Sequence, residues 1–135
     1  MKKRRSIILG TIQTIVAVAG ITAGLSMIFQ PDGRGIGIST DILLGSPFED
    51  FLIPGLFLFF VNGLFHGLGA ILSFTRHKYA GILGMILGVI LIIWICIQVY
   101  FISLTHFLQP TFFFVGILEM IQSYFLYGRM RFTSK

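Results

Sequence analysis

The sequence has few charged residues, and this shortage narrows the kind of protein that it encodes. Charged residues make up 11% of the 135 residues, against about 25% in soluble domains. Apolar residues make up 56%, above the roughly 45–50% of soluble domains. A soluble fold this apolar would expose large hydrophobic patches. The composition therefore predicts a membrane protein that is surrounded by the lipid bilayer.

The sequence also lacks the residues and motifs of most catalytic and metal sites. Its single cysteine, Cys96, excludes an intramolecular disulfide and lies inside an apolar run. No cluster of cysteine and histidine has metal-ligand spacing, and the acidic residues do not match a calcium-binding loop. The Gly-x-Ser-x-Gly, Walker A and His-Glu-x-x-His patterns are missing too. We therefore expect no cofactor, no metal and no catalytic residue, which disfavours an enzyme.

The net charge of +5 raises the possibility of nucleic-acid binding, but the positions of the charges argue against it. Nine of the ten Lys and Arg lie in "MKKRR", "TRHKY" and "GRMRFTSK". These stretches flank apolar runs and form no basic face interleaved with aromatics on a soluble element. No nucleic-acid partner is predicted.

Four apolar segments predict an all-α fold, a four-transmembrane-helix bundle that forms a single domain over residues 1–135. A helix of about 20 residues crosses the roughly 30 Å hydrocarbon core of a bilayer. The first segment is too long for the apolar region of a signal peptide and is not followed by a clear cleavage site, so we expect it to remain as a helix. The predicted helices cover residues 7–29, 51–74, 79–104 and 111–127.

The loop charges predict the orientation of these helices. With four spans, the three basic stretches fall on one side, and Arg34 is the only Lys or Arg on the other. Lys and Arg in short loops mark the cytoplasmic side, so both termini are expected in the cytoplasm. The loop 30–50 then lies outside, where "TDILL" is a candidate short helix capped by Thr40 or Asp41. Pro110 is expected as the first residue of the fourth helix.

The lengths of the connections predict which helices are neighbours. Only a few residues around Arg76–Lys78 join the second and third segments, which predicts a tight antiparallel hairpin. In lipid, helices associate largely through close packing, and glycines four residues apart give a flat stripe for it. Such stripes could pack the bundle, a homo-oligomer or a larger membrane partner. The candidate packing glycines are Gly20 with Gly24, Gly63 with Gly67, Gly84 with Gly88, and Gly116.

Four polar residues lie at depth in the second and fourth segments. Asn62 and His66 are four residues apart, and Glu119 and Gln122 are three apart, so each pair shares one helix face. Both helices run in the same direction, and counting residues places the two pairs at similar depths. We expect His66 and Glu119 to meet inside the bundle, flanked by Asn62 and Gln122. The cluster could be a structural clasp, a proton or ion path or ligand pocket, or a set of unrelated positions. Gln13 and Gln98 lie nearer the helix ends, where no special role is expected.

Two stretches carry a family resemblance. "GSPFEDFLIPGLFLF", from Gly45, and "IWICIQVYFISLTHFLQP", which ends at Pro110, resemble a group of small bacterial four-span membrane proteins with no assigned activity. The resemblance implies a bacterial plasma (inner) membrane location and transfers no catalytic residue.

Two hypotheses of function follow from the sequence. The leading one is a non-catalytic accessory or interaction component of the membrane that assembles through its glycine faces. The alternative is a small transporter or proton-coupled channel that uses Glu119 and His66.

Overall fold

A computed structural model describes residues 2–102 and 108–133, and within these ranges the chain forms helices and loops without a strand. The second long helix is interrupted by a π-helical segment, η3, and its three parts are together called helix two below. Four helices, one of them helix two, are long and apolar enough to cross a membrane. The long elements are α1 (Lys2–Phe29), helix two with its parts α2 (Leu52–Phe57), η3 (Leu58–Phe65) and α3 (His66–Phe74), α4 (Ala80–Ile102) and α5 (Leu108–Thr133).

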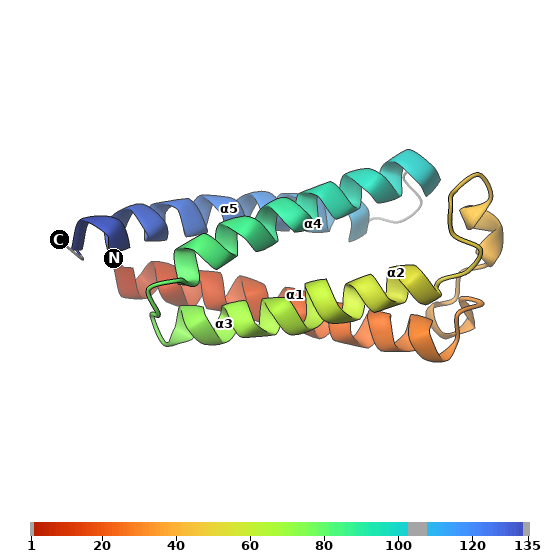
Figure 1. The fold of residues 1–135 in the computed structure, drawn as a ribbon, viewed down its shortest axis with the longest axis horizontal. Helices are drawn as coiled ribbons and strands as arrows, with labels where there is room; N and C mark the ends of the chain where they lie inside the picture. Colours follow the sequence, from red (N-terminus) through yellow and green to blue (C-terminus); the bar gives the residue numbers. More distant parts are fainter. Residues whose placement is uncertain (1, 103–107, 134–135) are drawn as a thin grey trace.

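The helices form two antiparallel pairs that close into a ring (Figure 1). α1 packs along the whole of helix two, and α4 packs along α5. The ring closes where α1 contacts α5 and where α3 contacts α4. Helix two and α5 are therefore diagonal to one another. The terminal end of the bundle holds the start of α1, the end of α5 and the α3–α4 turn, and the opposite, loop end holds residues 30–51 (Figure 1).

The prediction of a tight hairpin between the second and third segments is wrong over most of their length. α4 contacts helix two mainly through α3, next to their short connection, and the two helices then diverge toward the loop end (Figure 1). A short loop fixes only the nearest turns of two helices. The closest pairs are instead those in which glycines let the helix backbones approach.

Two of the helices extend beyond the apolar segments that predicted them. α1 begins at Lys2 rather than near residue 7, and α5 runs from Leu108 to Thr133 rather than from 111 to 127. Hydropathy marks where a helix is apolar, whereas hydrogen bonding decides where it ends. Pro110 is consequently the third residue of α5, still within the first turn, where its missing N–H leaves no helical bond unmade. The predicted end of the third helix, residue 104, lies outside the described residues.

The loop between α1 and helix two folds back onto the bundle. It contains two 3-10 turns, η1 (Arg34–Ile36) and η2 (Thr40–Leu43). The predicted short helix is thus present at η2, but its cap is Ser39, whose Oγ accepts a hydrogen bond from the Asp41 N–H at 3.2 Å. Leu43 of this loop is buried, and a bond from the Phe51 N–H to the Pro31 carbonyl closes its base at 2.9 Å.

Six of the seven predicted packing glycines lie at close helix contacts within the chain. Gly20 and Gly24 of α1 face the backbone of η3, at Asn62–Gly63 and at Phe59. Gly88 of α4 faces Gly116 of α5, and Gly84 faces Ser123. The glycine faces that could have served a partner are therefore covered by the protein's own helices.

Gly67 is the exception, because a side chain there would enter open space. Phe59 and Gly63 lie in the π-helical η3, whereas Gly67 lies in the α-helical α3, so a spacing of four does not keep one face across this junction. The stripe that faces α1 runs through Gly55, Phe59 and Gly63. A further step of four leaves the contact, and the buried face continues through His66 and Ala70 instead.

Candidate functional site: a buried polar cluster beside a cavity

The structure brings His66 and Glu119 together in the middle of the bundle. The first residue of α3 supplies His66, and α5 supplies Glu119 from the diagonal position. The Nε2 atom of His66 lies 3.1 Å from Oε2 of Glu119, and neither side chain is exposed at all. The predicted contact between these two residues is thus present, and it places two ionisable groups among apolar helices.

Gln13 is a third member of this cluster, and the interpretation that gave it no special role is wrong. Its side chain is fully buried, and its Nε2 donates a hydrogen bond to Oε1 of Glu119 at 3.3 Å. Its Oε1 accepts a hydrogen bond of 2.7 Å from the hydroxyl of Ser73. One signal in the sequence could have found it: Gln13 precedes Gly20 by seven residues, which is two helical turns on the same face. Judging Gln13 by its distance from the helix end alone missed this.

The hydrogen-bond partners of the pair limit where its hydrogens can lie. Nδ1 of His66 lies 3.2 Å from the carbonyl oxygen of Val61. A carbonyl can only accept, so this bond requires the hydrogen on Nδ1. Oε1 of Glu119 already accepts from Gln13, so a bond between Nε2 and Oε2 needs one more proton shared between them. The contact therefore needs a hydrogen on either Nε2 of His66 or Oε2 of Glu119.

The backbone next to the pair is irregular. Helix two is π-helical over η3, and His66 is the residue that directly follows. Short π-helical segments inside α-helices are rare and occur frequently at functional sites. The imidazole bonds to the carbonyl five residues earlier, inside this segment, so the irregular turn helps to orient the side chain that faces Glu119.

Asn62 and Gln122 do not flank the pair in the way that the sequence predicted. Gln122 is half-buried, and its Oε1 accepts a hydrogen bond from the guanidinium group of Arg5 at 3.1 Å. This bond directs it toward the terminal end. Asn62 is buried, yet its Oδ1 has no hydrogen-bond partner among the residues that the structure describes. Its side chain lines a cavity instead.

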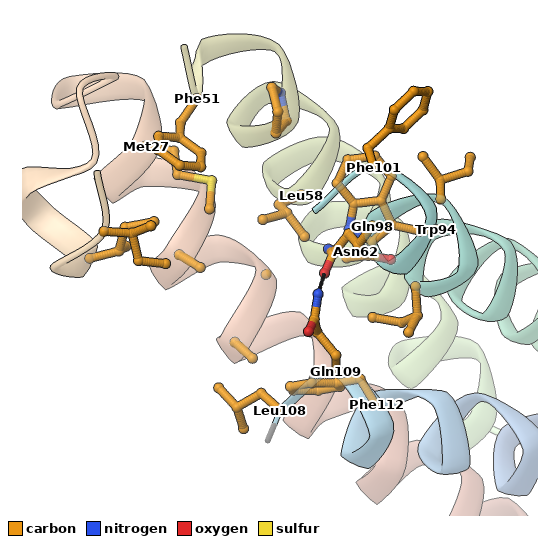
Figure 2. Close-up of a pocket in the computed structure, with 18 of the residues that line it drawn as sticks. Met27, Phe51, Leu58, Asn62, Trp94, Gln98, Phe101, Leu108, Gln109 and Phe112 are labelled. Carbon is orange, nitrogen blue, oxygen red and sulfur yellow. Dashed lines mark hydrogen bonds between the residues drawn. The ribbon is translucent and has the colours of Figure 1, made fainter. Parts of the chain in front are cut away.

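This cavity occupies the loop half of the bundle and has a volume of about 540 Å³ (Figure 2). It lies where α4 diverges from helix two, and residues of the loop 30–51 line it as well. Its walls are mainly apolar, with Asn62, Trp94, Gln98 and Gln109 as the larger polar groups. Gln109 donates a hydrogen bond to Gln98 across the cavity at 3.4 Å. Because Asn62 precedes His66 by one helical turn, the cavity ends close to the polar cluster.

An apolar cluster closes the other side of the pair. Leu9, Ala80 and Leu126 are completely buried and pack together, with Leu72 against them. Leu9 precedes Gln13 by one turn and Leu126 follows Glu119 by two, so this cluster lies between the pair and the terminal end. The loop-end cavity thus reaches Asn62, one turn before His66, and the apolar cluster lies on the other side of the pair.

Other chemistry gains no support from the parts of the chain that the structure describes. They contain no group of three or more His, Cys, Asp and Glu side chains that could hold a metal ion. No family model matches the chain, and neither a curated protein nor a solved structure matches it.

Proposed function

We propose that this protein is a multi-pass membrane protein that moves protons, as a small transporter or channel, and that the His66–Glu119 pair binds the proton in transit. The observation that carries the proposal is the 3.1 Å contact between two fully buried ionisable groups. Ionisable groups at such depth are costly in a membrane and commonly belong to ion or proton paths. The four apolar helices support a membrane location.

The surroundings of the pair suit a proton that enters from one side at a time. The cavity extends from the loop end as far as Asn62, one turn before His66, and the cluster of Leu9, Ala80 and Leu126 lies toward the terminal end. Beyond the pair toward that end, the buried hydroxyls of Ser6 and Ser123 have no partner among the described residues. A hydroxyl both donates and accepts, so these groups are suited to hold a water or pass on a proton once the leucines separate.

An accessory protein that assembles through its glycine faces has less support. Six of the seven glycines chosen for that role pack inside the chain, which leaves few of them to bind a homo-oligomeric or other membrane partner. Such partners remain predictions, as does the location in a bacterial plasma membrane.

The orientation rests on loop charge, with the termini in the cytoplasm and the loop end outside. We expect a cysteine at Ser39, in a chain that carries Cys96→Ala, to react with an impermeant thiol reagent on intact cells. A cysteine at His77, in the α3–α4 turn, is expected to react only after the cells are opened. Both positions are exposed, so accessibility within the fold does not bias the comparison. The opposite pattern would reverse the orientation. Ser134 gives the same prediction as His77 but lies outside the described residues.

Proton movement is tested in liposomes that contain a pH-sensitive dye, with a potassium gradient and valinomycin to impose a membrane potential. We expect liposomes with the wild-type protein to change internal pH faster than empty ones. Glu119→Gln is expected to reduce this rate to that of empty liposomes, because an amide cannot release the proton.

Glu119→Gln is also the variant that separates a proton path from a structural clasp. Its amide oxygen can accept from Gln13 and its N–H can donate to Nε2 of a neutral His66, so every hydrogen bond is kept. We expect its thermal stability in detergent to stay close to that of the wild type. Equal proton flux in the wild type and this variant, or no flux in either, would contradict the proposed function.

A further inference from the structure

The loop-end cavity has polar atoms that the protein itself leaves without partners. Oδ1 of Asn62 and Nε1 of Trp94 are buried and have no hydrogen-bond partner among the described residues. Their side chains are only 2% and 8% exposed, and both line the cavity (Figure 2). Leaving a buried polar atom unpaired is unfavourable, because its hydrogen bonds to water are lost and not replaced. Two such atoms at one cavity point to a bound molecule that completes their hydrogen bonds.

The chemistry of the two atoms defines the polar end of that molecule. Oδ1 of Asn62 can only accept a hydrogen bond, and the indole N–H of Trp94 can only donate one. A hydroxyl group does both, because it donates its hydrogen and accepts on its oxygen. The indole stacks on Phe57, with ring centroids 4.4 Å apart, and this contact fixes the direction of its N–H.

The rest of the cavity defines the body of the molecule. Among the wall residues that the structure describes, the cavity has no Asp, Glu, Lys or Arg side chain, so a charged ligand would find no counter-ion there. Apart from Ser46, the lining side chains from α1 and the loop are apolar, including Val16, Met27 and Leu43. A volume of about 540 Å³ falls within the roughly 300–1,000 Å³ of small-molecule sites.

We propose that the loop-end cavity binds a neutral amphiphile with an apolar body and a hydroxyl that pairs with Asn62 and Trp94. Binding at equilibrium requires no proton gradient and no change at Glu119. The site can therefore be tested independently of proton movement, and either proposal can fail while the other holds.

Trp94 is the only tryptophan in the sequence, so its fluorescence reports directly on the cavity. The probes are para-hexylphenol, its methyl ether para-hexylanisole, and hexylbenzene, which share an apolar body. The phenol can bond to both atoms, the ether can only accept from Trp94, and hexylbenzene can do neither. With purified wild-type protein in detergent, we expect the phenol to bind roughly tenfold more tightly than the ether, since one hydrogen bond to a buried acceptor is lost. Hexylbenzene is expected to bind more weakly still.

The variant that tests the site is Asn62→Leu, which removes the acceptor. We expect it to bind the phenol and the ether equally, whereas Thr14→Val keeps the wild-type preference. Thr14 lies on the exposed face of α1, and its hydroxyl bonds only to its own helix, at the Gly10 carbonyl. Equal binding of all three probes by the wild type, or an unchanged preference in Asn62→Leu, would overturn the proposal. If Asn62→Leu does not fold, the comparison of the three probes on the wild type still decides the matter.

A natural occupant could be a hydroxyl-bearing lipid or a small soluble alcohol or phenol. The two sources are distinguished by adding dioctanoylglycerol or plain phenol as competitors of para-hexylphenol. Displacement by the diacylglycerol alone indicates a lipid, and displacement by phenol alone indicates a small soluble ligand. Displacement by neither would contradict a hydroxyl-selective site.

Discussion

Glu119→Leu is expected to destabilise the protein by about 2–4 kcal/mol, one of the two largest losses predicted for a single substitution in this chain. The change removes a carboxyl group with two partners, so Nε2 of His66 and Nε2 of Gln13 both lose their hydrogen bonds inside the bundle. Each unpaired buried group costs about 1–3 kcal/mol. Polar contacts between membrane helices average only about 0.6 kcal/mol and reach about 1.7 kcal/mol, so we expect the loss in the lower half of the roughly 2–6 kcal/mol that two unpaired groups would cost. Thermal unfolding in mild detergent measures the loss.

A double-mutant cycle with His66→Leu isolates the contribution of the pair. The double variant should lose less stability than the two single variants added together. In the double variant, neither the imidazole of His66 nor the carboxyl group of Glu119 remains as a buried polar group without its partner. It should still fall below the wild type, since Gln13 then lacks an acceptor for its amide. Additive losses would mean that the 3.1 Å contact contributes nothing to the fold.

The pairing of His66 with Glu119 could be predicted because it depends on depth. Each residue lies near the middle of an apolar segment that is long enough to cross a bilayer, so counting residues places both at one level. The ring of four helices then brings diagonal inner faces together. Ionisable groups that are buried this deeply need hydrogen-bond partners, which predicts that the two side chains contact each other.

The sequence offered less guidance on Gln13 and Asn62, whose surroundings are set by helix packing. Gln13 belongs to the cluster because Gly20 and Gly24 hold α1 against helix two, which brings Gln13 level with Glu119 and Ser73. Asn62 faces a cavity because α4 leaves helix two toward the loop end. The apolar pattern of a single segment does not predict that two helices diverge, and it does not predict the cavity that opens between them.

Gly63→Leu is expected to lower stability by about 3 kcal/mol or to prevent the bundle from forming, whereas Gly67→Leu is expected to change it by less than about 0.5 kcal/mol. Both glycines were chosen from one four-residue stripe of helix two. A Cβ at Gly63 would come within 2.7 Å of Cγ1 of Ile21 and 3.1 Å of its backbone nitrogen. α1 would have to move away, which would also break the contact at Gly20. A side chain at Gly67 enters open space, and leucine favours a helix more than glycine does.

The two variants add the same side chain, to positions one helical turn apart, so helix propensity and hydrophobicity cancel in the comparison. Thermal unfolding in detergent gives the difference in stability. The separation of α1 should also weaken the bond between Gln13 and Glu119, because Gln13 depends on the same helix contact. Gly63→Leu is therefore expected to slow proton uptake in liposomes if any protein folds, while Gly67→Leu leaves the rate unchanged. Equal losses of stability at both positions would show that α1 does not approach helix two through Gly63.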